Sequence, residues 1–116
     1  MKVFISADIE GIGGVALWDQ ARTSGPEHRR ASEWMTAEVN AAIEGALEGG
    51  ATEVVVRDAH GRAGNILWES LHGRAKLISG WSAKPDMMPN TVIAVWCIGS
   101  WSAPAIWANC RYVMPP

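Results

Sequence analysis

Two pairs of polar residues stand directly after two apolar stretches of this 116-residue chain. Asp8 and Glu10 follow residues 2–7, and Asp58 and His60 follow residues 53–57. Short β-branched, apolar runs are typical of buried strands in parallel sheets. Ligands gather at the carboxyl ends of such strands, which lie only about 4.8 Å apart. Residues two apart point the same way if the strand geometry continues, so we expect two carboxylates and an imidazole to converge.

Carboxylates held this close repel each other, so one of them would stay protonated unless a cation lay between them. A divalent metal removes that conflict. Aspartate, glutamate and histidine ligands suit Zn²⁺, and on ligand type alone also Mn²⁺ or Fe²⁺. Such a metal lowers the pKa of bound water and polarises a carbonyl, which are the two needs of amide hydrolysis. The alternative is that Asp8 and Glu10 cap a turn or form solvated ion pairs, with His60 an ordinary loop residue.

The glycine-rich residues 11–16 also fit the dinucleotide fingerprint G-x-G-x-x-A after a strand. Three features argue against that interpretation. Asp8 and Glu10 would place negative charge against the pyrophosphate. The helix with clear start and end signals begins near Gly25 rather than at the glycines, so no helix N-terminus faces the phosphates. The acid expected about 20 residues later is instead Asp58, which is too distant.

A strand–helix–strand unit positions the two polar pairs. Ser24 and Glu27 have capping-box spacing with Pro26 in the first turn, and Gly49-Gly50 predicts the end of the helix. One apolar stripe at helical spacing comprises Ala31, Met35, Val39, Ala42, Ile43 and Ala46. Further along, the pattern predicts a short helix over 65–71 and strands over 75–79 and 91–98. The predicted fold class is α/β with a mainly parallel sheet containing this βαβ unit.

Composition excludes several classes of partner. A net charge of -2 with scattered Lys and Arg side chains gives no reason to expect nucleic-acid binding. The apolar start is too short for a membrane segment or a signal peptide, so we expect no membrane association and a cytoplasmic location.

Several aromatic side chains are assigned no role in binding. The tryptophans expected to cover core or subunit contacts rather than substrate are Trp18, Trp34, Trp68 and Trp81. His28 and His72 lie on or beside predicted helices with no partner in the sequence pattern, and are expected to face solvent rather than to bind a metal.

The last part of the chain differs in character from the rest. From about Pro85 the sequence is rich in Trp, Pro and Cys, and after Asp86 the only charged side chain is Arg111. We therefore expect residues 1–90 to form the recognisable α/β unit and residues 91–116 to be a divergent tail. A frameshift that replaced the continuation near residues 85–100 would explain the change.

Four blocks of the chain, in order, resemble the D-aminopeptidase (DppA-like) family, peptidase family M55. They are Ser-Ala-Asp-Ile-Glu-Gly at 6–11, Met-Thr-Ala-Glu-Val-Asn-Ala-Ala at 35–42, Val-Val-Arg-Asp-Ala-His-Gly at 55–61 and Leu-Ile-Ser-Gly at 77–80. The resemblance covers about residues 1–90. It implies a peptidase with two zinc ions that releases N-terminal D-amino acids from short peptides and assembles into ring-like homo-oligomers.

By the same resemblance, Asp8 would bridge the two zinc ions, Glu10 would bind one and His60 the other. Asp58 and Asn65 are expected, from position alone, to orient these ligands. No catalytic residue is assigned. Family members are more than twice as long and supply two further metal ligands and another active-site histidine from beyond this point.

Where such members have Gly-Tyr-His-Ala, this chain has Gly-Ser-Trp-Ser at 99–102, and no histidine follows His72. The sequence therefore predicts a zinc-dependent D-aminopeptidase, truncated relative to its family, whose activity is impaired. The alternative is a non-catalytic remnant or an associating subunit. A two-metal phosphoesterase is a third possibility, because clusters of carboxylates and histidine also serve phosphate chemistry.

Overall fold

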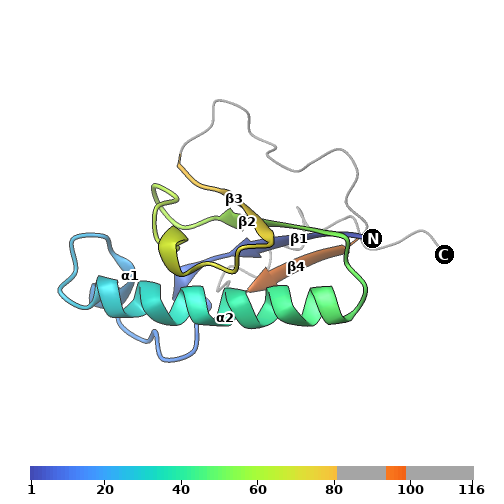
Figure 1. The fold of residues 1–116 in the computed structure, drawn as a ribbon. Coiled ribbons are helices and arrows are strands. Elements are labelled where there is room, and N and C mark those ends of the chain that lie inside the picture. The colour runs from blue at the N-terminus through green and yellow to red at the C-terminus, as the bar shows by residue number, and fades with distance from the viewer. Residues whose placement is uncertain (81–93, 99–116) are drawn as a thin grey trace.

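A four-stranded sheet forms the centre of the molecule (Figure 1). The structure is a computed structural model that describes residues 1–80 and 94–98. The strands are β1 (Lys2–Ala7), β2 (Glu53–Asp58), β3 (Ala75–Ile78) and β4 (Ala94–Ile98), in the order β3-β2-β1-β4. All three neighbouring pairs are parallel, which confirms the predicted α/β class and parallel sheet.

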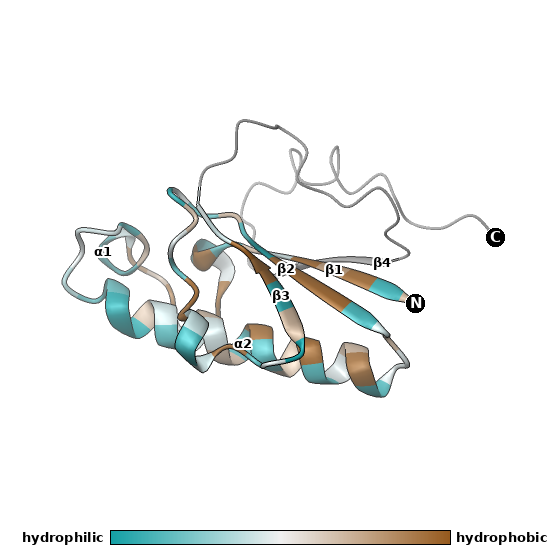
Figure 2. Cartoon of the chain, turned by 45° about the horizontal axis from the view of Figure 1, so that its top comes forward, coloured by the Kyte–Doolittle hydropathy of each residue, from teal (hydrophilic) through white to brown (hydrophobic). Residues whose placement is uncertain are grey.

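Helix α2 (His28–Glu48) connects β1 to β2 and lies along one face of the sheet (Figure 1). Its buried face contains the predicted apolar stripe together with Ser32 and Thr36. Alternate residues of β1 and β2 meet this face, namely Val3, Ile5, Ala7, Val54 and Val56. Figure 2 shows the hydrophobic middle of these strands above the helix. Full burial of such a side chain is worth roughly 1.5–3 kcal/mol, so this layer fixes where β1 and β2 end.

The start of α2 differs from the prediction. The helix begins at His28 with Glu27 as its N-cap, and no side chain caps it. Ser24 and Glu27 form no capping box, because residues 22–28 instead make two successive turns, with Gly25 N donating to Arg22 O and His28 N donating to Gly25 O. A side chain at Gly25 would lie 1.8 Å from the Asp19 carbonyl oxygen, so only glycine permits this chain path.

The predicted end of α2 is confirmed. Gly49 is the C-cap, and Gly50 has a φ of 90° in the left-handed region that glycine adopts without strain. The N–H of Ala51 then donates to the carbonyl of Ala46, and the chain enters β2 directly. This tight stop sets the register in which Lys2 faces Glu53 and Ala7 faces Asp58.

Three short elements complete the described chain: η1 (Ile9–Gly11), α1 (Trp18–Ala21) and η2 (Trp68–Ser70). The short helix predicted over 65–71 is therefore a single 3-10 turn, and α1 was not predicted. No helix in the described ranges has the length and apolarity needed to cross a membrane. Apart from β4, the predicted divergent tail over residues 91–116 lies outside the described residues, as does Trp81.

Candidate metal centre

The carboxyl ends of β1 and β2 lie side by side because the two strands pair in register up to Ala7 and Asp58. One further hydrogen bond, from Ala59 N to Ala7 O at 2.8 Å, continues the pairing past the strand ends. Asp8 is therefore the first residue beyond β1, and His60 the second beyond β2. The predicted meeting place of the polar pairs is thus an edge of the sheet that the hydrophobic core holds in place.

The extended geometry assumed for the first pair does not continue. The chain turns into η1 directly after Asp8, so Glu10 lies on a 3-10 turn rather than on a strand. Its side chain still approaches the same point as Asp8, because the turn folds back toward the strand ends.

Three side chains converge there. Nδ1 of His60 lies 3.2 Å from Oδ1 of Asp8 and 2.7 Å from Oε2 of Glu10. One ligand atom from each residue lies within 4.8 Å of the other two. The side chains are 12% exposed for His60, 28% for Asp8 and 31% for Glu10, so the cluster opens to solvent on one side.

The two carboxyl groups have opposite pKa shifts. Burial, together with the hydrogen bond to Glu10 and its negative charge, raises the pKa of Asp8 from 3.8 to about 7. Burial also raises the pKa of Glu10, but the hydrogen bond from Asp8, its own backbone and His60 together hold that pKa below its ordinary value. Without a cation, the pair therefore shares one proton near neutral pH.

Comparison with known proteins decides the family of this chain. A profile of peptidase family M55, described as D-aminopeptidase, matches residues 1–103. This chain belongs to the D-aminopeptidase family. It is 39% identical over 88 residues to a D-aminopeptidase of Bacillus subtilis (strain 168), a match that covers 76% of this chain and 32% of that protein.

A solved member of the same family has the same fold. It is the Zn-dependent D-aminopeptidase DppA from Bacillus subtilis, described as a self-compartmentalizing protease. The TM-score is 0.81 at 34% identity, over 86% of this chain and 38% of that structure. This D-aminopeptidase-family chain therefore spans about a third of the length of the relatives that it matches.

The donor set of the D-aminopeptidase-family chain fits a zinc ion. Oε2 of Glu10 is buried and has no hydrogen-bond partner among residues 1–80 and 94–98, although Nδ1 of His60 is only 2.7 Å away. A ring nitrogen forms one hydrogen bond through its hydrogen or its lone pair. Of the two close contacts of Nδ1, the one to Asp8 has the geometry of a hydrogen bond. A buried carboxylate oxygen without a donor is costly, and a cation between these groups would remove that cost. Two carboxylates and one imidazole are ligands that Zn²⁺ accepts.

Asp58 does not join the cluster. It is fully buried, and its carboxylate accepts four N–H groups of the following loop. Oδ2 accepts from the backbone of Asn65 at 2.5 Å and of Ile66 at 2.9 Å, while Oδ1 accepts from Asn65 Nδ2 at 2.8 Å and from His60 N at 3.3 Å. The carboxylate thus closes the loop that carries His60 onto the end of β2.

Asn65 connects this loop to α2 through His28. Its Nδ2 donates to Asp58 Oδ1 and to His60 O, both at 2.8 Å, which leaves its Oδ1 to accept. His28 Nε2 lies 2.9 Å from that Oδ1 and therefore donates to it. His28 was expected to face solvent rather than to bind a metal; its side chain is half-buried, because the turns before α2 place the helix start against the His60 loop. No local pattern signals a contact between residues so far apart in the sequence.

Proposed function

We propose that this chain forms the zinc-binding N-terminal part of an aminopeptidase that hydrolyses short peptides with N-terminal D-amino acids. The observation that carries the proposal is the convergence of Asp8, Glu10 and His60, with a buried Glu10 oxygen that lacks a donor. Family membership adds support, since a solved relative at 34% identity is described as a Zn-dependent D-aminopeptidase.

The three converging residues would hold the metal; with two ions bound, Asp8 would be shared between them, Glu10 would serve one and His60 the other. Bound zinc supplies a Lewis acid that polarises an amide carbonyl and makes water a nucleophile near neutral pH. Asp8 must give up its proton for this role, and Glu10 is already ionised. His60 presents Nδ1 to the carboxylates, so Nδ1 is its ligand atom in this proposal.

Asp58 and Asn65 would act by orienting His60. Both hold the backbone of the His60 loop rather than its ring, so they fix the position from which the imidazole projects. His28 adds a third point of attachment through Asn65.

This chain by itself is expected to hydrolyse peptides weakly or not at all. Three ligands shared between two ions leave each ion short of donors, and the sequence has no histidine after His72 and no acid after Asp86. A non-catalytic subunit is therefore the second candidate. In either case we propose a homo-oligomer, since the solved relative is described as self-compartmentalizing. The cytoplasmic location is proposed from the sequence alone.

Zinc titration and a peptidase assay on the same preparation test the proposal. The full chain should bind zinc, and Glu10→Gln should weaken binding at least about 100-fold, because outer contacts of a metal ligand alone are worth 10–100-fold. Glu33→Gln is the matched control, since Glu33 is exposed and its ion-pair partner among the described residues is Arg29. Release of D-alanine from D-alanyl amide, and none of L-alanine from its enantiomer, would support the enzyme. Zinc binding without release would favour the non-catalytic subunit, and equal binding by Glu10→Gln would refute the centre.

A further inference from the structure

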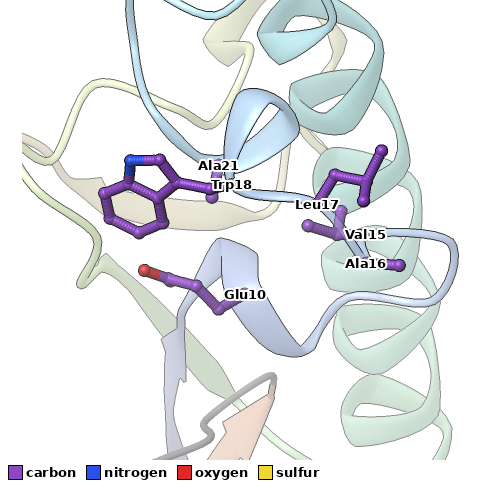
Figure 3. A pocket seen from close by; sticks show the side chains of 6 residues that line it. All are labelled: Glu10, Val15, Ala16, Leu17, Trp18 and Ala21. Atoms are coloured by element: carbon purple, nitrogen blue, oxygen red, sulfur yellow. The ribbon is translucent and has the colours of Figure 1, made fainter.

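An apolar pocket adjoins the metal centre and shares Glu10 with it (Figure 3). Its other lining residues come from the loop after η1 and from α1, namely Val15, Ala16, Leu17, Trp18 and Ala21. In Figure 3 the Trp18 indole lies directly above the Glu10 side chain. The pocket has a volume of about 280 Å³, and Glu10 is the one charged residue among those that line it.

Two apolar side chains of this pocket are exposed to solvent instead of being packed in the hydrophobic core. Leu17 is 63% exposed and Trp18 is 66% exposed, side by side in the sequence and both on the pocket wall. Exposed apolar side chains that gather around a concavity mark binding sites rather than ordinary surface.

Buried Gln20 holds the wall of the pocket in one shape. Its Oε1 accepts from the backbone of both Ala16 and Leu17 at 2.8 Å, and its Nε2 donates to Gly14 O at 3.3 Å. Glu38 fixes the start of the same loop by accepting from Gly13 N at 2.7 Å. The apolar wall is therefore formed in the absence of a ligand, which lowers the cost of binding one.

Resting on the proposed function, we propose that this pocket receives the side chain of the substrate's N-terminal residue and selects apolar residues larger than alanine. In the proposed reaction the scissile carbonyl would lie at the metal, and the α-carbon bonded to that carbonyl carries the amine and the side chain of the N-terminal residue. Of these two groups only the side chain can be apolar, and Glu10 belongs to both the metal centre and the apolar pocket, so the pocket suits that side chain. Trp18 and Leu17 are the specificity-determining residues.

The size and chemistry of the pocket set the preference. A dry protein cavity of about 150 Å³ holds benzene, so this pocket has room for an isobutyl or benzyl group. A methyl group would leave most of it empty. Each fully buried methylene is worth about fourfold in affinity. Leucine has three more side-chain carbons than alanine, but the pocket is partly open and buries them incompletely, so we expect leucine to bind about tenfold better. An acidic side chain would find no cationic partner on the lining and would meet Glu10.

The test uses amino alcohols, which carry the N-terminal amine and side chain but no amide to hydrolyse. D-alaninol, D-leucinol and D-phenylalaninol are titrated into the zinc-supplemented full chain while the indole N–H resonances are followed by NMR. The Trp18 resonance is identified by its loss in Trp18→Phe. We expect it to shift with D-leucinol and D-phenylalaninol at about tenfold lower concentration than with D-alaninol.

Three variants complete the experiment. Leu17→Ser should weaken D-leucinol binding about fivefold, Trp18→Phe should retain it, and Trp68→Ser is the control, because Trp68 is 77% exposed and lies outside the pocket. No response of the Trp18 resonance, or an equal response to all three alcohols, would overturn the pocket even if amides are hydrolysed. Altered sedimentation of Leu17→Ser with unchanged alcohol binding would show a subunit contact instead. A preserved preference without amide hydrolysis would support the pocket while the proposed activity fails.

Discussion

Nδ1 of His60 lies 2.7 Å from Oε2 of Glu10, yet within the described part of the chain that carboxylate oxygen has no hydrogen-bond partner. Nδ1 forms its hydrogen bond with Asp8 instead, at 3.2 Å. One ring nitrogen therefore lies close to two carboxyl groups in a partly buried place. Such an arrangement is costly as it stands and becomes favourable when a divalent cation is shared among the three groups.

Zinc binding should strengthen as pH rises toward 7. Asp8 has an ordinary pKa of 3.8 and a pKa of about 7 in the fold, so the folded state holds a proton that the unfolded chain releases. Between these values the metal-free protein loses stability as pH rises, whereas zinc gains a ligand. The zinc-induced increase in Tm should therefore be larger at pH 8 than at pH 5.5. Thermal scans with zinc and with EDTA at both pH values measure it, and an equal increase would contradict the role of Asp8.

Asp8→Asn should have opposite effects on stability and on metal binding. The substitution removes the charge that repels Glu10, so the metal-free protein should be more stable than the wild type at pH 8. Zinc affinity should fall at least about 100-fold, because a ligand is lost. Calorimetry and thermal scans measure the two effects. Asp19→Asn, an exposed residue paired with Arg22, is the control and should change neither. Loss of stability in Asp8→Asn would indicate a structural role.

Asp58→Asn should destabilise the fold more than any exposed substitution. In the wild type the two carboxylate oxygens of Asp58 accept from four N–H groups of the His60 loop. In the variant an NH₂ group replaces one of these oxygens and faces N–H donors that it cannot accept. Because hydrogen bonds to a charged group are worth about 1.5–3 kcal/mol, the free energy of unfolding should fall by about 3 kcal/mol. Urea denaturation checks the value. A loss below about 0.5 kcal/mol would mean that the loop does not depend on this carboxylate.

His28→Ala should lower zinc affinity without touching the metal centre. The substitution leaves Asn65 Oδ1 without its donor, so the His60 loop is held less firmly. We expect a threefold to tenfold loss of zinc affinity and about 1 kcal/mol of stability. His28→Gln keeps an N–H donor and should recover part of both. Zinc titration and urea denaturation of the two variants check this, and identical behaviour of Ala and Gln would exclude the hydrogen bond as the cause.

The spacing of apolar residues along the sequence predicted the strands and the helix whose buried faces repeat at a regular period. The apolar runs of β1 and β2 and the stripe on α2 are periodic, and burial enforces that periodicity. The convergence of Asp8 and His60 followed because parallel strands end at one edge. The start of α2 was misplaced because the close approach of Gly25 to Asp19, rather than a capping side chain, sets the chain path.

Contacts between segments that are far apart in the sequence could not be predicted from such spacing. The bond from His28 to Asn65 and the position of Trp18 beside Glu10 depend on how loops fold against each other. Trp18 was expected to cover core or subunit contacts; its indole is exposed on a pocket wall and so does not cover the core, while a subunit contact stays a prediction. The assignment of Asp8, Glu10 and His60 as zinc ligands stays a prediction.

The most direct test is a crystal structure of the full chain grown with zinc, with anomalous diffraction recorded at the zinc edge. We expect a peak among Asp8, Glu10 and His60, about 2.0–2.2 Å from their ligand atoms. A peak bound elsewhere, for example at Cys97 or Cys110, with these three side chains free of metal, would contradict it.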